Sequence, residues 1–235
     1  MRRWPDLLLE SEMNVKSYLI DVQAGREAIQ GDLNIPEKSR SIVVFAHGTG
    51  SGRYSPRNKY VAEVLNKAGI ATLLVDLLTS DEEREDVRTG RLRFDIDLLS
   101  ERLLAATRWL RTQSATRGLR AGYFGASTGA GAALVAAAKE PDLVDAVVSR
   151  GGRPDLAGPW LLRVHAPTLL IVGGNDPIVI DLNYQAAAEL RTKHRLEIIS
   201  GAGHLFEEPG ALERVAQLAR DWFEQHLIPA SRHVA

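Results

Sequence analysis

The sequence of 235 residues contains no cysteine. This absence excludes a disulfide framework, a zinc site built from thiolates and a cysteine nucleophile. Any covalent catalysis by this chain must therefore use another type of side chain.

The sequence also lacks an excess of charge of either sign. Its 29 basic and 30 acidic residues leave a formal net charge of -1, so no strong field attracts a polyanion. We therefore expect neither nucleic acid nor a membrane surface as a partner. Long apolar runs are missing too, because charges interrupt every hydrophobic segment before it reaches the roughly 20 residues of a membrane-spanning helix.

Near the start of the sequence the apolar run is short, since Leu7–Leu9 supplies only three leucines. A secretory signal needs a longer apolar core, so we expect a cytoplasmic protein. The composition, 45% hydrophobic and 25% charged, is typical of globular proteins, and the length suits one domain. We predict a single domain over residues 1–235, with loose ends at 1–14 and 229–235.

Strand patterns and helix patterns alternate along most of the chain. Two segments with alternating polarity, 16–23 and 27–35, predict an antiparallel hairpin. Continuous apolar runs then predict strands that are covered on both faces. These runs lie at 41–46, 70–75, 119–124, 143–149, 167–172 and 195–200. Helical patterns lie between them at 56–68, 95–113, 128–139, 178–191 and 209–227.

This alternation predicts an α/β fold with a mostly parallel sheet, helices on both faces and the hairpin at one edge. Fewer than twenty residues separate the strand ending at 149 from the one starting at 167, so a short loop fits there and a large cap domain does not. We expect the charged segment 81–93 to be a solvated loop; a cover over the functional site is the alternative.

A G-x-S-x-G motif spans residues 125–129, with Ser127 at its centre. Such a motif places a nucleophilic serine on a tight turn between a strand and a helix. The apolar run before it and the alanine-rich segment 130–138 after it supply that context. A nucleotide-binding turn is the competing interpretation, but the G-x-G-x-x-G and G-x-x-x-x-G-K spacings are absent. We predict that Ser127 is a nucleophile.

A serine hydroxyl needs a base to remove its proton and a carboxylate to orient that base. Asp176 follows the strand predicted at 167–172 and His204 follows the last predicted strand, so both should reach the same sheet edge as Ser127. Asp181 is the alternative acid, although it falls inside a predicted helix. No other histidine lies in a loop directly after the final strand; the others are His47, His165, His194, His226 and His233.

At this point the sequence resembles the α/β-hydrolase superfamily, and more narrowly its capless, dienelactone-hydrolase-like branch. The likeness runs from about Val15 to Leu227 and rests on the serine, aspartate and histidine motifs. It implies the α/β-hydrolase fold and esterase activity. The namesake enzymes of the branch use cysteine where this chain has Ser127, so a dienelactone substrate is not implied.

The segment after the first central strand, residues 47–50, is expected to form half of an oxyanion hole. The donors would be the backbone N–H groups of Thr49 and Thr128, and a one-residue shift would replace Thr49 by Gly48 or Gly50. His47 is expected to hold this loop by hydrogen bonding rather than to act as a second base. Because His47, Asp176 and His204 lack the tight spacing of metal ligands, we predict no metal and no cofactor.

Four arginines follow strand ends and should lie near Ser127; they are Arg53, Arg57, Arg150 and Arg153. They either hold a substrate carboxylate or pair with acidic residues of the protein. Arg150 is the strongest candidate for substrate binding, because it comes directly after its strand.

The leading hypothesis is hydrolysis of a small ester or lactone through an acyl-enzyme on Ser127. The same three residues would also serve an acyltransferase, a peptidase or a carbon–carbon hydrolase, which the sequence does not separate. A non-catalytic binding protein with this fold is a hypothesis of a different class. The expected partner of the enzyme is a small ester, anionic if the arginines bind it. The sequence does not indicate an oligomeric state.

Overall fold

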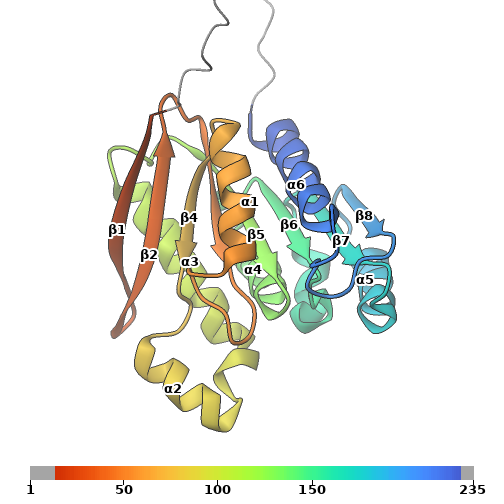
Figure 1. Ribbon diagram of the computed structural model, residues 1–235. Helices are drawn as coiled ribbons and strands as arrows, with labels where there is room; N and C mark the ends of the chain where they lie inside the picture. The colour runs from red at the N-terminus through yellow and green to blue at the C-terminus, as the bar shows by residue number, and fades with distance from the viewer. Residues whose placement is uncertain (1–13, 229–235) are drawn as a thin grey trace, which may run out of the picture.

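The computed structural model describes residues 14–228 (Figure 1). At its centre lies an eight-stranded sheet with the order β1-β2-β4-β3-β5-β6-β7-β8. The strands are β1 (Val15–Ala24), β2 (Glu27–Pro36), β3 (Ser41–Ala46), β4 (Ala71–Val75), β5 (Arg120–Ala126), β6 (Ala146–Arg150), β7 (Thr168–Gly173) and β8 (His194–Ile199). Except for Asn14, the ends predicted to be loose lie outside the described residues. The Asn14 carbonyl accepts a hydrogen bond from the Glu37 N–H.

The sheet confirms the predicted α/β-hydrolase architecture. Strands β1 and β2 form an antiparallel hairpin at one edge of the sheet, and β2 also pairs antiparallel with β4. All neighbours from β4 to β8 pair in parallel. Parallel strands bring their carboxyl ends to one edge, so the loops after β3, β5, β7 and β8 gather there.

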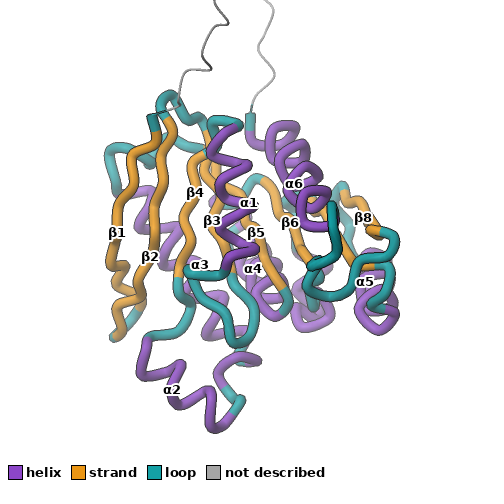
Figure 2. The backbone as a smooth tube through the Cα atoms, in the orientation of Figure 1, coloured by secondary structure: helices purple, strands orange, loops and turns teal. Residues whose placement is uncertain are grey.

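Helices cover both faces of the sheet, with α1 and α6 on one face and α3, α4 and α5 on the other (Figure 2). The helices are α1 (Pro56–Lys67), α2 (Ser80–Thr89), α3 (Ile96–Thr112), α4 (Thr128–Lys139), α5 (Pro177–Glu189) and α6 (Ala211–Leu227). Two buried apolar clusters fill the space between sheet and helices. The predicted start of α1 holds, because Ser55 accepts the Asn58 N–H and Pro56 is the first helical residue. None of the helices described is long and apolar enough to cross a membrane.

Helix α2 corrects the prediction of a solvated loop at 81–93. A capping box begins it: the Thr79 hydroxyl accepts the Glu82 N–H, and the Glu82 carboxylate accepts the Thr79 N–H. Gly90 ends it with a left-handed φ of 65°. The segment looked like a loop because it has almost no apolar face, whereas its caps and an Arg102–Glu82 ion pair of 2.7 Å hold it as a helix. In Figure 1 it lies below the sheet, at the edge where β4 ends.

The connection between β6 and β7 is short, as predicted, but it is not irregular. It forms 3₁₀ turns over Pro154–Arg163, with Gly158 as a kink between them. Its buried Ala157 and Leu161 join the apolar cluster that includes α4. No cap domain is inserted within residues 14–228, so the carboxyl edge of the sheet is covered only by loops and α2.

Candidate active site

Ser127 occupies the tight turn between β5 and α4, as the motif predicts. Its φ is 50° and its ψ is -122°, a conformation that favours glycine and costs another residue about 1–3 kcal/mol. The neighbouring glycines are required by close backbone approach. A Cβ at Gly125 would lie 2.5 Å from the Ala130 Cα, and one at Gly129 would lie 2.2 Å from the Ala46 carbonyl oxygen. The turn is therefore built to present one strained serine.

Asp176 and His204 lie together at the same edge. The Asp176 Oδ2 atom is 2.7 Å from His204 Nδ1. Because a carboxylate accepts, Nδ1 must donate, which leaves Nε2 of the neutral ring free to accept a proton. Asp181, the alternative acid, lies within α5 and makes no hydrogen bond to His204. The histidine side chain is 41% exposed and the aspartate 17%, so substrate can reach the ring.

The end of β6 lies between Ser127 and His204. On one side the Ser127 N–H donates to the Arg150 carbonyl at 3.3 Å, and the Arg153 N–H donates to the Ser127 carbonyl at 3.0 Å. On the other side a Cβ built at Gly151 would lie 3.7 Å from Cε1 of His204. Among the described residues the Ser127 hydroxyl forms no hydrogen bond with the ring. Such contacts often form only when substrate binds.

The side chains of the two residues predicted to supply the oxyanion hole, Thr49 and Thr128, contact each other. The hydroxyls of Thr49 and Thr128 lie 3.3 Å apart. Thr128 is the first residue of α4, so its N–H has no acceptor within the helix. In the loop after β3 the Ser51 N–H donates to the Gly48 carbonyl. Gly48 packs on the nucleophile, since a Cβ there would lie 2.9 Å from the Ser127 Cβ. The Thr128 N–H, which lacks a helical acceptor, is available to stabilise a negative oxygen near Ser127.

His47 holds this loop in place, in line with the structural role expected for it. Its Nε2 accepts the Leu77 N–H at 2.9 Å, so Nδ1 carries the proton and donates to the Gly48 carbonyl at 3.0 Å. Burial lowers the pKa of His47, which keeps the ring neutral. With both nitrogens engaged, His47 is not available as a base.

Comparisons with known proteins show to which family the chain belongs. The model of the dienelactone hydrolase family matches residues 29–227. The chain belongs to the dienelactone hydrolase family. The crystal structure of a dienelactone hydrolase from Anabaena variabilis is 60% identical and superposes with a TM-score of 0.89 over 91% of this chain and 99% of that one. Family membership and the matching fold support a hydrolase.

Two curated relatives of this dienelactone hydrolase family member carry other names. A Mycobacterium tuberculosis protein with a provisional phosphoribosyl transferase name is 60% identical over 208 residues, which are 88% of this chain and 46% of that protein. The chain thus spans about half the length of that relative. A Bradyrhizobium protein named as a 2-oxo-3-(5-oxofuran-2-ylidene)propanoate lactonase is 27% identical over 172 residues, 64% of this chain and 69% of that one.

In this family member a small cavity of about 40 Å³ lies next to residues 47–51 of the loop after β3. One wall is formed by the loop after β3 and by Thr128, and α2 forms much of the opposite wall. The segment 81–93 therefore covers one side of this cavity, which is closer to the alternative, a cover, than to a solvated loop. The residues contributed by the α2 side and its surroundings are Leu78, Glu83, Asp86, Val87, Arg93 and Leu99.

Three of the four candidate arginines pair with acidic residues. The buried Arg53 forms an ion pair with Asp76, and its Nη2 donates to Gln30 at 2.9 Å. Arg153 donates two hydrogen bonds to Asp155, at 2.8 and 2.7 Å. These contacts fit the alternative in which the arginines pair with acidic residues of the protein. We give Arg53, which was expected to bind substrate, no such role, because its guanidinium pairs with Asp76 and Asp32 of the protein.

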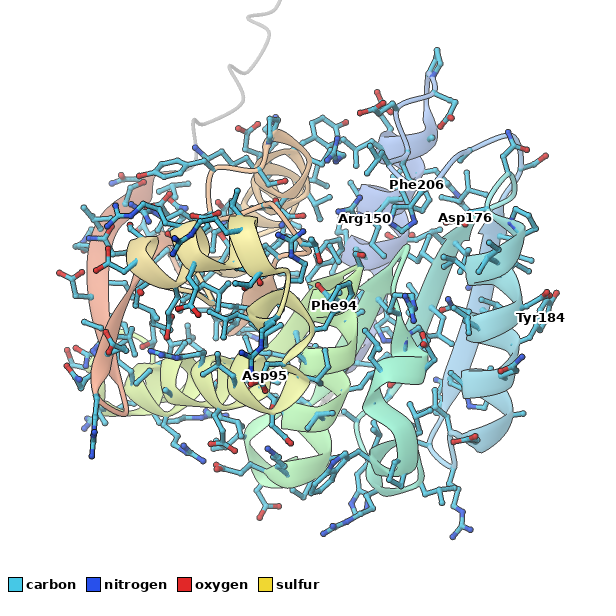
Figure 3. The ribbon with its side chains drawn as sticks, turned by 90° about the horizontal axis from the view of Figure 1, so that it is seen from below. Phe94, Asp95, Arg150, Asp176, Tyr184 and Phe206 are labelled. Carbon is cyan, nitrogen blue, oxygen red and sulfur yellow. The ribbon has the colours of Figure 1, made fainter. Side chains whose placement is uncertain are left out.

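Arg57 is the third of these, and only Arg150 behaves differently. Arg57 pairs with Glu207 at 3.0 Å. Arg150 is only 7% exposed and forms no ion pair or hydrogen bond through its side chain within the described part of the chain. Burial and the nearby Arg57 charge lower the pKa of Arg150 to about 10, so it is still charged at neutral pH. Figure 3 shows Arg150, Phe206 and Asp176 in one region of the sheet edge.

Phe206 was missed at the level of sequence. Its ring is 1% exposed and lies 5.8 Å from the Arg150 guanidinium carbon. Its φ of 57° turns the chain sharply two residues after His204. In the sequence, only its place two residues after His204 could have pointed to Phe206, since a single apolar residue in a loop forms no distinctive pattern.

The remaining histidines contribute nothing to this site. His226 packs against Trp222 with ring centroids 4.4 Å apart and the rings tilted by 52°, and His194 forms a hydrogen bond with the Thr192 carbonyl. His165 is exposed, and His233 lies outside the described residues. Within residues 14–228, no group of three or more histidines and carboxylates is placed to hold a metal ion.

Proposed function

We propose that the protein is a serine hydrolase that cleaves a small ester or lactone through an acyl-enzyme on Ser127. The observation that carries this proposal is the 2.7 Å contact between Asp176 and Nδ1 of His204, at the sheet edge where the strained Ser127 is presented. A carboxylate, an imidazole and an alcohol in this order are the parts that acyl transfer to serine requires.

The proposed reaction has two halves. In the first, the Ser127 hydroxyl attacks the carbonyl carbon while Nε2 of His204 takes its proton, and Asp176 stabilises the resulting imidazolium. The N–H groups of Thr49 and Thr128 stabilise the oxyanion, typically by about 2.7–4 kcal/mol for one donor. The tetrahedral intermediate then collapses, and His204 passes its proton to the leaving alcohol. In the second half, water repeats the sequence on the acyl-enzyme and releases an acid.

The comparisons support an ester or lactone as the bond that is cleaved. The family is named for a lactone hydrolase, and the Bradyrhizobium relative is named as a lactonase. The provisional phosphoribosyl transferase name belongs to a protein of which this chain matches 46%. Because the matched part is the part that fits the dienelactone hydrolase family, we propose that the transferase name refers to the rest of that relative.

The experiment is steady-state turnover of short activated esters by the parent protein and by Ser127→Ala. We expect the parent to release acid and alcohol, and the variant to lose activity by more than about 10³-fold. Added amines, thiols or peroxide test for acyl transfer: diversion of most of the acyl group to one of them would favour an acyltransferase. Equal activity of Ser127→Ala and the parent would overturn the proposal. Complete inertness of the folded parent toward esters and serine-directed probes would favour a binding protein.

A further inference from the structure

The cavity beside α2 and the His204 ring lie on opposite sides of Ser127. The strand order β4-β3-β5-β6-β7-β8 places the turn after β5, which presents Ser127, between two groups of loops. The loops after β7 and β8 carry Asp176 and His204 on one side. The loops after β3 and β4, together with α2, form the cavity on the other side. Figure 3 shows the same separation, with α2 on the left and Asp176 on the right.

This arrangement determines which part of an ester faces the cavity. In the proposed reaction His204 returns a proton to the leaving alcohol, so the alcohol lies on the His204 side. The carbonyl oxygen is directed to the N–H of Thr128, a residue that lines the cavity together with Thr49. The acyl chain is the remaining substituent of the carbonyl carbon. The cavity is therefore placed to receive the acyl chain.

The volume of the cavity limits the acyl chain that fits. It measures about 40 Å³, whereas one water molecule requires about 10–15 Å³ and an apolar cavity that binds benzene measures about 150 Å³. About three water-sized groups fit, which corresponds to the carbons that follow the carbonyl in a butyryl group. A hexanoyl chain or a benzoyl ring exceeds this space.

Three apolar side chains of different exposure line the cavity. Leu99 on α3 is 3% exposed and belongs to the buried apolar cluster on that face of the sheet. Leu78 is partly buried against the same cluster, and Val87 on α2 is 74% exposed. The cavity thus extends from the surface at Val87 to the core at Leu99. Leu99 is therefore the residue that limits its depth.

The charges on the wall favour an uncharged acyl chain. Asp76, Glu83 and Asp86 line the cavity. Asp86 pairs with Arg93 at 2.7 Å and Asp76 pairs with Arg53, which leaves Glu83 without an ion pair within residues 14–228. A carboxylate on the acyl chain would lose hydration on entering the cavity and would meet a negative wall.

We propose that this cavity is the acyl pocket of the enzyme and that it selects short, uncharged acyl groups of up to about four carbons, with Leu99 setting the limit of length. This inference rests on the proposed serine hydrolase function. It adds to that function the class of acyl group and the residue that determines it.

The test is a series of p-nitrophenyl esters in which the alcohol is constant and the acyl group is acetyl, butyryl, hexanoyl or benzoyl. Each kcat/KM is divided by the rate constant for hydroxide-catalysed hydrolysis of the same ester. We expect similar values for acetate and butyrate, and a fall of about 10- to 100-fold at hexanoate and benzoate. On an open apolar surface the value would instead rise by up to about fourfold with each buried CH₂.

A second pair of esters tests the charge of the acyl chain. Monomethyl succinate carries a carboxylate where methyl succinamate has a neutral amide of similar shape. We expect the normalised kcat/KM of the succinate to be lower by about two- to fivefold. In Glu83→Gln this difference should become smaller, because the unpaired carboxylate of the wall is removed.

Variants at Leu99 link the limit of length to one residue. Leu99→Ala should raise the ratio of kcat/KM for hexanoate to that for butyrate by at least about tenfold. Leu99→Val should raise it less, and it replaces the alanine variant if thermal unfolding shows that the latter is not folded. Leu110→Ala is the matched control. Leu110 lies on the same helix, is 2% exposed and belongs to the same apolar cluster, but it does not line the cavity, so its ratio should equal that of the parent.

The outcomes separate this inference from the proposed function. A parent whose normalised values stay level or rise from butyrate to hexanoate, or that cleaves monomethyl succinate faster than its amide, overturns the acyl pocket while the hydrolase function stands. An unchanged ratio of hexanoate to butyrate in the folded Leu99 variants overturns the role of that leucine. Hydrolysis of none of the esters counts against the hydrolase function itself, and this inference falls with it.

Discussion

The Asp176 carboxylate accepts a hydrogen bond of 2.7 Å from Nδ1 of His204, although 28 residues separate the two in the chain. The contact exists because β7 and β8 are neighbouring parallel strands whose carboxyl ends share one edge. It fixes the tautomer of the ring, so Nε2 is the atom that can take a proton from Ser127. Each part of the proposed chemistry depends on this contact.

Replacing that carboxylate should be far more damaging than replacing its neighbour. Asp176→Asn should lower kcat/KM by about 10³- to 10⁴-fold, because the amide no longer accepts from Nδ1 and favours the wrong tautomer. Asp181→Asn, on the exposed side of α5, is the matched control and should change kcat/KM by less than about twofold. Ester turnover at pH 8 measures both. The assignment of the acid would be wrong if the Asp181 variant were the inactive one.

The strained turn predicts an unusual ranking of stability. Ser127→Gly and Ser127→Ala both remove the nucleophile, but only alanine keeps a Cβ at a φ of 50°. We expect the glycine variant to exceed the alanine variant in free energy of unfolding by about 1–2 kcal/mol, after allowing for the greater chain entropy of glycine. Urea unfolding checks this. A glycine variant less stable than the alanine variant would mean that the turn is not strained.

Asp86 should make the stability of the α2 region depend on pH. Burial acts to raise its pKa, but hydrogen bonds from Arg93 more than offset this and leave the pKa below its usual value. A carboxyl whose folded-state pKa is lowered stabilises the fold above its ordinary pKa of about 4, and this contribution is lost as the pH falls further. We expect Asp86→Asn to be less stable than the parent at pH 7 by roughly 1–3 kcal/mol.

The control for Asp86 is the same comparison at acidic pH. The difference in free energy of unfolding between parent and Asp86→Asn should shrink between pH 5 and pH 3, and limited proteolysis at pH 7 should cut the variant faster within residues 80–94. A difference that stays constant over this pH range would show that the carboxylate charge does not hold α2.

Much of the fold and the central residues could be predicted from sequence because their signals are local. An apolar run, a turn with glycines and an alanine-rich helix mark the Ser127 turn without any knowledge of distant contacts. Asp176 and His204 could be placed because parallel strands bring their carboxyl ends together. The prediction of a loop at 81–93 was wrong because it rested on the high charge of the segment. It overlooked the capping box of Thr79 and Glu82, which begins α2.

The sequence could not show which arginines pair with acidic residues and which do not, because such pairs depend on the tertiary structure. Arg53 forms an ion pair with Asp76, which lies 23 residues away in the chain. Arg150 meets no carboxylate among residues 14–228, and its position directly after a predicted strand did not show this. Phe206 likewise becomes relevant only when the loop after β8 folds over β6.

The most direct test of the central claim is labelling with a fluorophosphonate, followed by mass spectrometry of the intact protein and its peptides. The account predicts a single adduct on Ser127, fast labelling in Asp181→Asn, slow labelling in Asp176→Asn and none in Ser127→Ala. An adduct on another residue, or labelling of Ser127→Ala at the rate of the parent, would contradict it.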